Sequence, residues 1–122
     1  MVTVLVAEDE FAVLEVLSMA LEGEGYRVLK AGDGADALRI LTSHICDVIV
    51  CDENMPVMDG KQLIAAVRAN PELKHTPIIL MADTWGRSLP VVDAAIVLGK
   101  PILLAELLGH IERLGSSSRR EP

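Results

Sequence analysis

Short, almost uninterrupted runs of apolar residues recur along this chain and constrain its fold more than any other feature. The runs at residues 2–7, 48–51 and 77–81 have the length of strands, and they carry apolar side chains at odd and even positions alike. A strand with two apolar faces must be covered on both sides, which is typical of parallel sheets enclosed between helices. The sequence therefore predicts an α/β fold.

Segments with helical periodicity alternate with these runs. Phe11, Leu14, Leu17 and Leu21 recur at helical spacing after the first run, so we expect them on the buried face of a helix that glycines end. The expected strands lie at residues 2–7, 26–30, 48–51, 77–81 and 95–98, and the expected helices at residues 11–21, 35–41, 60–69 and 104–114. With right-handed crossovers these units form a doubly wound, five-stranded parallel sheet between two layers of helices.

The segment between the fourth and fifth strands breaks this alternation. Gly86 and Pro90 disfavour a long helix there, so the fourth helix is expected to be short or displaced. Residues 116–122 are polar and show no periodicity, and we expect them to form a frayed tail or the stub of a linker. The domain is accordingly predicted at residues 1–115.

Length and charge limit the classes of function. The 122 residues suffice for one domain, and 51% hydrophobic residues with a single Phe, Trp and Tyr predict an aliphatic core. Eighteen acidic against eleven basic residues give a net charge of −7, which opposes direct binding to nucleic acid or to an anionic membrane. Proteins or cations are the expected partners. Neither a membrane-spanning stretch nor a signal peptide is evident, so we expect a cytoplasmic location.

Charged residues follow three of the apolar runs. Glu8 and Asp9 come directly after the first run, Asp52 after the third and Lys100 after the fifth. Because the carboxyl ends of parallel strands meet at one edge of a sheet, these side chains should gather where open α/β folds bind ligands. Carboxylates so close either raise one another's pKa values or hold a hard divalent cation, and we favour Mg²⁺.

Lys100 and the acids together indicate phosphoryl chemistry. A compact ammonium beside a metal ion matches the oxygens of a transferring phosphoryl group. An aspartate can accept such a group once cations neutralise the charge that repels an incoming phosphate. Asp52 is therefore the expected nucleophile. Each of these residues taken singly is equally compatible with an ordinary solvated surface charge.

The chain resembles the response-regulator receiver domains of two-component signalling in three ordered blocks. These are VLVAEDE at residues 4–10, DVIVCDENMPVMDG at residues 47–60, and Lys100–Pro101. In the middle block Asp52 is followed by Pro56 and Gly60 at the family's spacing. The likeness extends over residues 2–114, and it implies a flavodoxin-like, three-layer sandwich.

The resemblance also implies roles for individual residues. Receiver domains take a phosphoryl group from a histidine kinase or a phosphotransfer protein. They are not conventional enzymes, but they catalyse the phosphorylation and dephosphorylation of their own aspartate. Carried over to this chain, the roles are phosphoacceptor for Asp52, Mg²⁺ ligands for Glu8, Asp9, Asp52 and the backbone carbonyl of Asn54, phosphoryl contact for Lys100, and a cis peptide bond before Pro101.

Two positions depart from the family pattern. Ala82 stands where receiver domains have the Thr or Ser whose hydroxyl binds the phosphoryl group, and Val97 stands where they commonly have a switch Tyr or Phe. A hydrogen bond to a charged group contributes roughly 1.5–3 kcal/mol, so phosphorylation should be coupled less strongly to a conformational change. Thr84 offers a hydroxyl at another position, and Asp83 either faces Asp52 or caps the following segment.

Two functional hypotheses follow. The first is a competent phosphoacceptor that takes phosphate on Asp52 with Mg²⁺ and signals through a downstream protein or a homodimer. The alternative is a degenerate receiver that acts as a protein-docking module independent of phosphate. Phosphate uptake at Asp52 discriminates between them.

Overall fold

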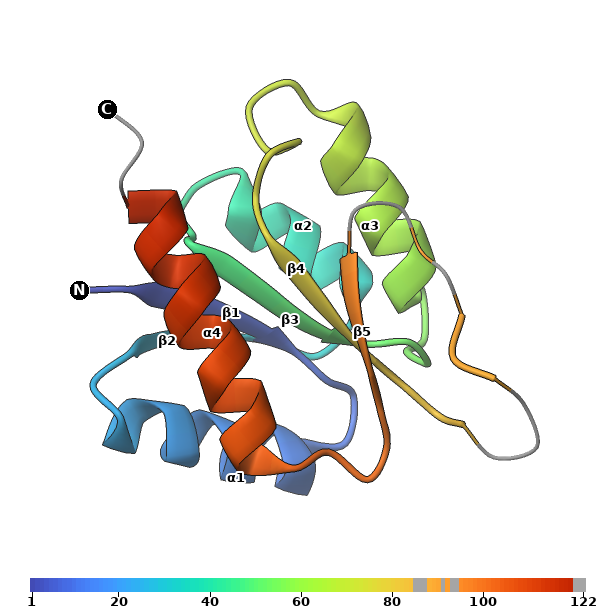
Figure 1. The fold of residues 1–122 in the computed structure, drawn as a ribbon. Coiled ribbons are helices and arrows are strands. Elements are labelled where there is room, and N and C mark those ends of the chain that lie inside the picture. Colours follow the sequence, from blue (N-terminus) through green and yellow to red (C-terminus); the bar gives the residue numbers. More distant parts are fainter. Residues whose placement is uncertain (85–87, 91, 93–94, 120–122) are drawn as a thin grey trace.

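A five-stranded parallel sheet forms the centre of the computed structural model, which describes residues 1–84, 88–90, 92 and 95–119 (Figure 1). Its strand order is β2-β1-β3-β4-β5, as expected for the predicted doubly wound fold. The strands are β1 (Thr3–Ala7), β2 (Arg27–Ala31), β3 (Val48–Asp52), β4 (Ile78–Ala82) and β5 (Ala95–Gly99). The helices are α1 (Phe11–Gly23), α2 (Gly34–Leu41), α3 (Gly60–Ala69) and α4 (Leu104–Arg119).

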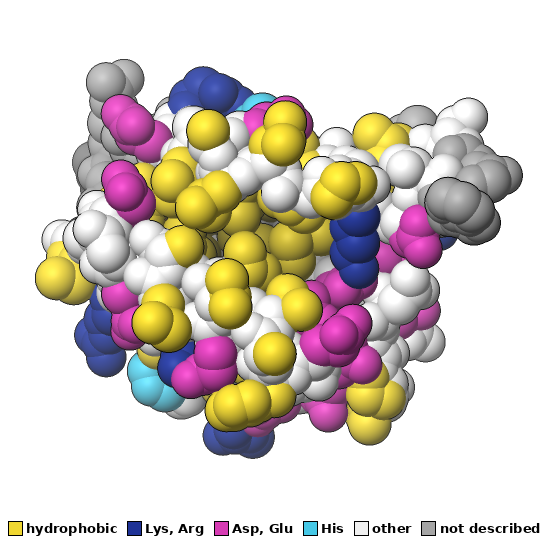
Figure 2. All heavy atoms as spheres, turned by 90° about the horizontal axis from the view of Figure 1, so that it is seen from below, with side chains coloured by type: hydrophobic (Ala, Val, Ile, Leu, Met, Phe, Trp, Pro, Cys, Tyr) yellow, Lys and Arg dark blue, Asp and Glu magenta, His cyan; other side chains and the backbone are white. Residues whose placement is uncertain are grey.

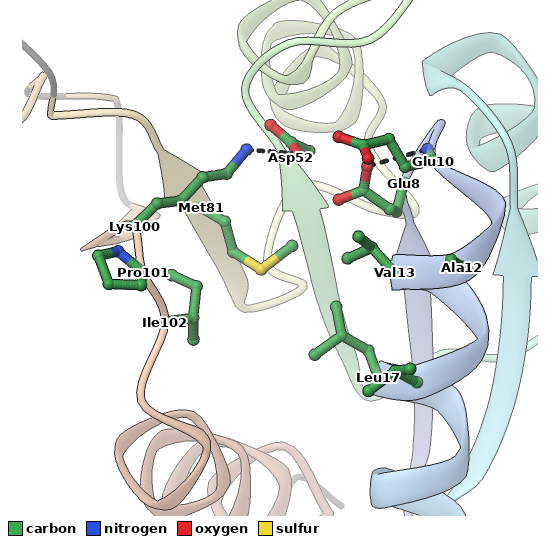
Figure 3. A pocket seen from close by; sticks show the side chains of 11 residues that line it. Glu8, Glu10, Ala12, Val13, Leu17, Asp52, Met81, Lys100, Pro101 and Ile102 are labelled. Carbon is green, nitrogen blue, oxygen red and sulfur yellow. Dashed lines mark hydrogen bonds and ion pairs between the residues drawn. The ribbon is translucent and has the colours of Figure 1, made fainter.

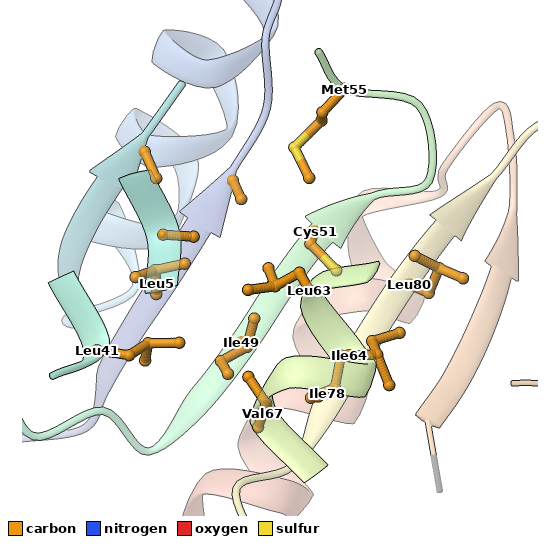
Figure 4. Close-up of a cluster of buried hydrophobic side chains, with 13 residues drawn as sticks. Leu5, Leu41, Ile49, Cys51, Met55, Leu63, Ile64, Val67, Ile78 and Leu80 are labelled. Carbon is orange, nitrogen blue, oxygen red and sulfur yellow. The ribbon is translucent and has the colours of Figure 1, made fainter. Parts of the chain in front are cut away.

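Helices cover both faces of the sheet, which confirms the prediction from doubly apolar strands. Figure 1 shows α1 and α4 on one face and α2 and α3 on the other. Successive strand residues point to opposite faces. Leu5 and Ile49 therefore pack with Leu63 and Ile64 beneath α3 (Figure 4), whereas their neighbour Val4 joins the cluster under α1 and α4. The two aliphatic cores hold the middle of the sheet rigid beneath its carboxyl edge.

Side-chain caps fix where two helices begin. The Asp33 carboxylate accepts a hydrogen bond from the Asp36 N–H at 2.7 Å at the start of α2. At the start of α3, Asp59 and Gln62 form a reciprocal capping box. The second cap sets the exit of the loop that follows β3, and that loop borders the candidate site.

The connection from β4 to β5 contains no helix among its described residues, which are 83, 84, 88–90 and 92. Residues 85–87, 91 and 93–94, on which the predicted short or displaced fourth helix partly falls, lie outside the described residues. The helix labelled α4 is thus the one that follows β5. Thr84 and Leu89 lie against Gly99, where a Cβ would meet Thr84 Cγ2 at 2.8 Å.

The last helix is longer than predicted. α4 continues to Arg119, whereas the sequence predicted that this helix ends near residue 115. Serine is only a mildly unfavourable helix residue, and each added residue completes one more backbone hydrogen bond, so loss of periodicity alone did not end the helix. The division between a domain at residues 1–115 and a tail at residues 116–122 stays a prediction. Among the helices described, none combines the length and the apolar character that crossing a membrane requires.

Candidate functional site

Three acidic side chains gather at the carboxyl edge of the sheet. β1 pairs with β3 in a register that sets Ala7 beside Cys51, so the next residues along the chain, Glu8 and Asp52, are neighbours. Glu8, Asp9 and Asp52 each offer a carboxylate oxygen, and these oxygens all lie within 4.8 Å of one another. Glu8 and Asp52 are each only 3% exposed, whereas Asp9 is exposed. The sequence-based expectation that these acids converge on one point matches this geometry.

The pKa of Glu8 is shifted by its position in this cluster. Burial, a hydrogen bond with Asp52 and the negative charge of Asp52 raise the pKa of Glu8 to about 7. A hydrogen bond from the Glu10 N–H to Glu8 Oε2, at 3.1 Å, acts in the opposite direction. A divalent cation would relieve the repulsion between the carboxylates, and a set of hard oxygen donors fits Mg²⁺.

The Asp52 carboxylate is held at both of its oxygens. Oδ1 accepts a hydrogen bond from the backbone N–H of Asn54 at 3.0 Å, and Oδ2 accepts one from Lys100 Nζ at 2.7 Å. Figure 3 shows the ammonium reaching Asp52 from the opposite side to Glu8. Partial burial lowers the pKa of Lys100, but the hydrogen bond and the charge of Asp52 raise it by more, so its pKa lies above the usual value. Lys100 is therefore a cation in this arrangement.

The end of β5 directs Lys100 to Asp52. Ala82 and Gly99 are paired at the ends of β4 and β5, and the Lys100 N–H continues the ladder by donating to the Ala82 carbonyl at 2.8 Å. The Lys100–Pro101 peptide bond that follows is cis. The lysine side chain leaves the edge strand here and crosses the end of β4 to reach β3.

Gly60 fixes the backbone behind Asp52. A Cβ on Gly60 would lie 2.4 Å from the Asp52 carbonyl oxygen, so a larger residue does not fit without moving the backbone. The Gly60 N–H donates to the Glu53 carbonyl at 3.0 Å. In the same loop Val57 has a φ of 69°, which is rare for a β-branched residue. This loop is therefore closely constrained on the side of Asp52.

The two altered positions lie close to the site but differ in surroundings. Ala82 is fully buried at the end of β4, one residue beyond the partner of Asp52. Val97 is half-buried in β5 and packs against the core under α2 and α3. Neither side chain offers a hydroxyl or an aromatic ring. The Thr84 methyl group faces Gly99, and the charge of Asp83 acts on Lys100.

Two buried acids received no role in the sequence-based reasoning. Asp47 Oδ2 accepts a hydrogen bond from the Thr3 N–H at 2.8 Å, which ties the start of β3 to β1. Glu53, next to Asp52, is paired with Lys61 Nζ at 3.4 Å. Both acids flank an apolar strand in the sequence, but exposed acids are also common at such positions. Only the partners seen in the structure, Thr3 for Asp47 and Lys61 for Glu53, show that these two acids are buried and paired.

A cleft of about 480 Å³ opens from Asp52 and Lys100 along α1. Figure 2 shows this hollow lined with hydrophobic side chains, with basic and acidic side chains at one end. Several apolar residues of α1 are exposed at the surface, among them Phe11 (75%), Val16 (66%) and Met19 (68%). The prediction that Phe11 lies on the buried face was wrong, because the helix begins at Phe11, beyond the edge of the sheet. Leu14 and Leu21 are buried as predicted.

Comparison with known proteins identifies the family. The sequence model for the response regulator receiver domain matches residues 4–112. The chain belongs to this family. Receiver domains act in two-component signalling, so the three blocks of the sequence and the acidic edge of the sheet have a common explanation. The prediction of a receiver domain from those blocks is confirmed.

Curated relatives of this receiver domain include both single-domain and longer proteins. It is 32% identical over 116 residues to a probable chemotaxis protein CheY of Rhizobium etli, covering 91% of this chain and 90% of that protein. It is 35% identical over 113 residues to the transcriptional regulatory protein PrrA of Mycobacterium tuberculosis, covering 91% of this chain. The chain spans about half the length of PrrA, since the match covers 48% of that protein.

Solved structures of receiver domains have the same fold. The signal receiver domain of a signal transduction histidine kinase from Syntrophus aciditrophicus aligns with a TM-score of 0.88 at 29% identity, covering 100% of this chain and 96% of that one. The chemotaxis response regulator CheY4 of Vibrio cholerae aligns with a TM-score of 0.81 at 34% identity, covering 93% and 98% of the two chains. The predicted flavodoxin-like receiver fold is thereby confirmed.

Proposed function

We propose that this receiver domain accepts a phosphoryl group on Asp52 from a histidine kinase or a phosphotransfer protein. The observation that carries the proposal is the position of Asp52 between Lys100, at 2.7 Å, and the carboxylates of Glu8 and Asp9. A nucleophilic carboxylate thus has a fixed cation on one side and a candidate cation site on the other.

The donor set suits a magnesium ion held by Glu8, Asp9, Asp52 and the backbone carbonyl of Asn54. Such an ion supplies positive charge that offsets the repulsion between the carboxylates and an incoming phosphoryl group. The raised pKa of Glu8 is consistent with this assignment, because it reflects first the burial of the carboxyl group and then its hydrogen bond with Asp52 and the negative charge of Asp52.

In the proposed reaction a carboxylate oxygen of Asp52 bonds to phosphorus while the bond from phosphorus to the donor atom breaks. Lys100 shifts its hydrogen bond from Asp52 to an oxygen of the arriving phosphoryl group, so its charge stays paired throughout. The Asn54 N–H keeps the other oxygen of Asp52 in place. Water later hydrolyses the aspartyl phosphate at the same site.

The surface beside the cleft supports a protein as the phosphoryl donor. Phe11 and Val16 are exposed on α1, and Val16 lines the cleft that reaches Asp52. Exposed apolar side chains of this size are typical of protein contacts. The net charge of −7 favours a partner with a basic surface over nucleic acid. Signal output through a downstream protein or a homodimer belongs to the same proposal.

Ala82 and Val97 favour a second candidate function, a docking module that does not respond to phosphate. Without a hydroxyl at position 82, the phosphoryl group lacks one hydrogen-bond donor that would pull on the end of β4. In this alternative the partner surface keeps one shape whether or not Asp52 is phosphorylated.

Intact-mass spectrometry tests the proposal. The protein is incubated with acetyl phosphate and Mg²⁺, and Asp52→Asn and a chelator serve as controls. We expect a single phosphate adduct that both controls abolish. Absence of the adduct, together with failure to bind Mg²⁺ in a calorimetric titration, would reject the phosphoacceptor in favour of the docking module.

A further inference from the structure

The cleft beside Asp52 contains more apolar space than phosphoryl transfer alone requires. Its charged end is formed by Glu8, Glu10, Asp52 and Lys100, and its volume is about 480 Å³. A phosphoryl group and a hydrated cation fill the space of about six to eight water molecules, or roughly 180–240 Å³ at 30 Å³ each. About half of the cleft is left over.

The remaining half is lined by apolar side chains from three parts of the fold. Val13, Val16 and Leu17 come from α1, Met81 from β4 and Ile102 from the segment after β5. In Figure 3, Val13, Leu17, Met81 and Ile102 border one gap that runs from the Asp52–Lys100 pair along the helix. A site of this size with charge at one end suits a small ligand that has an apolar body and an anionic head.

We propose that this apolar half holds the organic group of a small phosphoryl donor, so that bulky apolar acyl phosphates phosphorylate Asp52 faster than acetyl phosphate does. This inference rests on the proposed function of Asp52. The phosphoryl group of the donor occupies the charged end, and the acyl group lies between Val13 and Ile102. The cleft thereby determines donor specificity, which the charged residues alone do not.

The chemistry of the step favours an acyl phosphate as the donor. An Asp52 oxygen forms a bond to phosphorus, the bond between phosphorus and the acyl oxygen breaks, and the electron pair leaves with the acyl carboxylate. This leaving group needs no proton. A phosphate ester would leave as an alkoxide, which is a much stronger base than a carboxylate and departs readily only when an acid protonates it.

Rates with benzoyl phosphate and acetyl phosphate test the inference. Asp52 phosphorylation is followed by intact-mass spectrometry at a fixed Mg²⁺ concentration, and kcat/KM is obtained for each donor. Burial of the ring is expected to give a ratio of benzoyl to acetyl rates of about ten or more. The two donors differ in intrinsic reactivity, so the decisive quantity is the change of this ratio between variants.

Two exposed residues of α1 provide a matched pair of variants. Val16 lines the cleft, whereas Met19, which is exposed to a similar extent, does not. Val16→Ser should lower the ratio about threefold to fivefold, because a hydroxyl replaces apolar contact surface. Met19→Ser should leave the ratio as it is in the parent protein.

The outcomes distinguish failure of the apolar donor site from failure of the phosphoacceptor assignment of Asp52. If acetyl phosphate labels Asp52 but the ratio is the same in the parent and in Val16→Ser, the donor site is refuted while the phosphoacceptor assignment stands. If neither donor labels Asp52, both proposals fall together. A ratio that falls equally in Val16→Ser and Met19→Ser would also refute the cleft, since it would indicate a general effect on α1.

Discussion

Lys100 Nζ lies 2.7 Å from Asp52 Oδ2, although the two residues are 48 positions apart. Asp52 ends β3 and Lys100 directly follows β5, with β4 between these two strands. This contact joins the edge strand of the sheet to its central strand through one side chain. It also means that the cation required by the proposed phosphoryl transfer is in place before any donor binds.

Replacing this lysine should therefore affect both stability and chemistry. Lys100→Met leaves the buried Asp52 carboxylate without its cation, and removing one partner of such a pair costs about 1–3 kcal/mol or more. We expect a lower free energy of unfolding in urea without Mg²⁺, and at least a tenfold slower phosphorylation of Asp52.

A second lysine offers a matched control for this variant. Lys30 Nζ also lies 2.7 Å from a carboxylate oxygen, that of Glu15, but this pair is at the surface. Lys30→Met should change stability by less than about 1 kcal/mol and phosphorylation not at all. Equal effects of the two variants would contradict the role assigned to Lys100.

The raised pKa of Glu8 predicts a specific dependence of stability on pH. In the folded protein this pKa is about 7, compared with 4.5 for an ordinary glutamate, so the folded state holds the proton more tightly than the unfolded state. The contribution of Glu8 to stability is therefore present below pH 4.5 and is lost as the pH rises towards 7. Without Mg²⁺, the loss should be of the order of 1–3 kcal/mol.

Urea unfolding of Glu8→Gln between pH 5 and pH 8 measures this contribution. The variant should be more stable than the parent at pH 8 and should lack most of the parent's fall in stability. Glu10→Gln, which changes a neighbouring exposed acid, should keep the fall. A fall that persists unchanged in Glu8→Gln would rule out Glu8 as its origin.

Restoring a hydroxyl at position 82 should strengthen the response to phosphate. Ala82→Ser places an unpaired hydroxyl in a fully buried position and costs about 1–3 kcal/mol in the free protein. With beryllofluoride and Mg²⁺ at Asp52 that hydroxyl gains an acceptor. Backbone amide shifts around β4 and β5 should then be larger than in the parent. Ala37→Ser, equally buried but located in α2, should show the parent's shifts.

A methyl group on Gly60 should disturb the site from behind. Its Cβ would lie 2.4 Å from the Asp52 carbonyl oxygen, a contact that only a backbone movement can relieve. We expect Gly60→Ala to cost about 2–4 kcal/mol in urea unfolding and to weaken Mg²⁺ binding measured by calorimetry. In Gly109→Ala the added methyl group meets nothing within 4 Å, so this helix should gain up to about 1 kcal/mol. A Gly60→Ala protein with unchanged Mg²⁺ affinity would refute the link to Asp52.

The sequence located the strands well but ended four of them, β2 to β5, one residue early. β3, β4 and β5 continue through Asp52, Ala82 and Gly99, each one position beyond the last large apolar residue. The ladder is made of backbone groups and continues where side-chain hydrophobicity ends. Asp52 therefore belongs to the rigid sheet, whereas hydrophobic patterning alone ended the strand before it.

The candidate site was predictable in composition but not in contacts. The carboxyl ends of parallel strands meet at one edge of the sheet, so the sequence predicted that Glu8, Asp52 and Lys100 lie close together. The hydrogen bond between Lys100 and Asp52 depends on the register of β5 against β4, which no local pattern encodes. The exposed apolar residues of α1 were missed for a related reason. Helical periodicity shows that the helix has an apolar face, but it does not show how much of that face the sheet covers.

Lys100 crosses the end of β4 at Ala82, and this path has a thermodynamic consequence for any partner of the edge strand. A partner that holds β5 in a different position must move the ammonium relative to Asp52, and so it changes the affinity of the acidic site for its ligands. Linkage requires the reverse effect to be equal in size. Occupancy of the acidic site then alters the affinity for that partner by the same factor, even with no hydroxyl at position 82 and no ring at position 97.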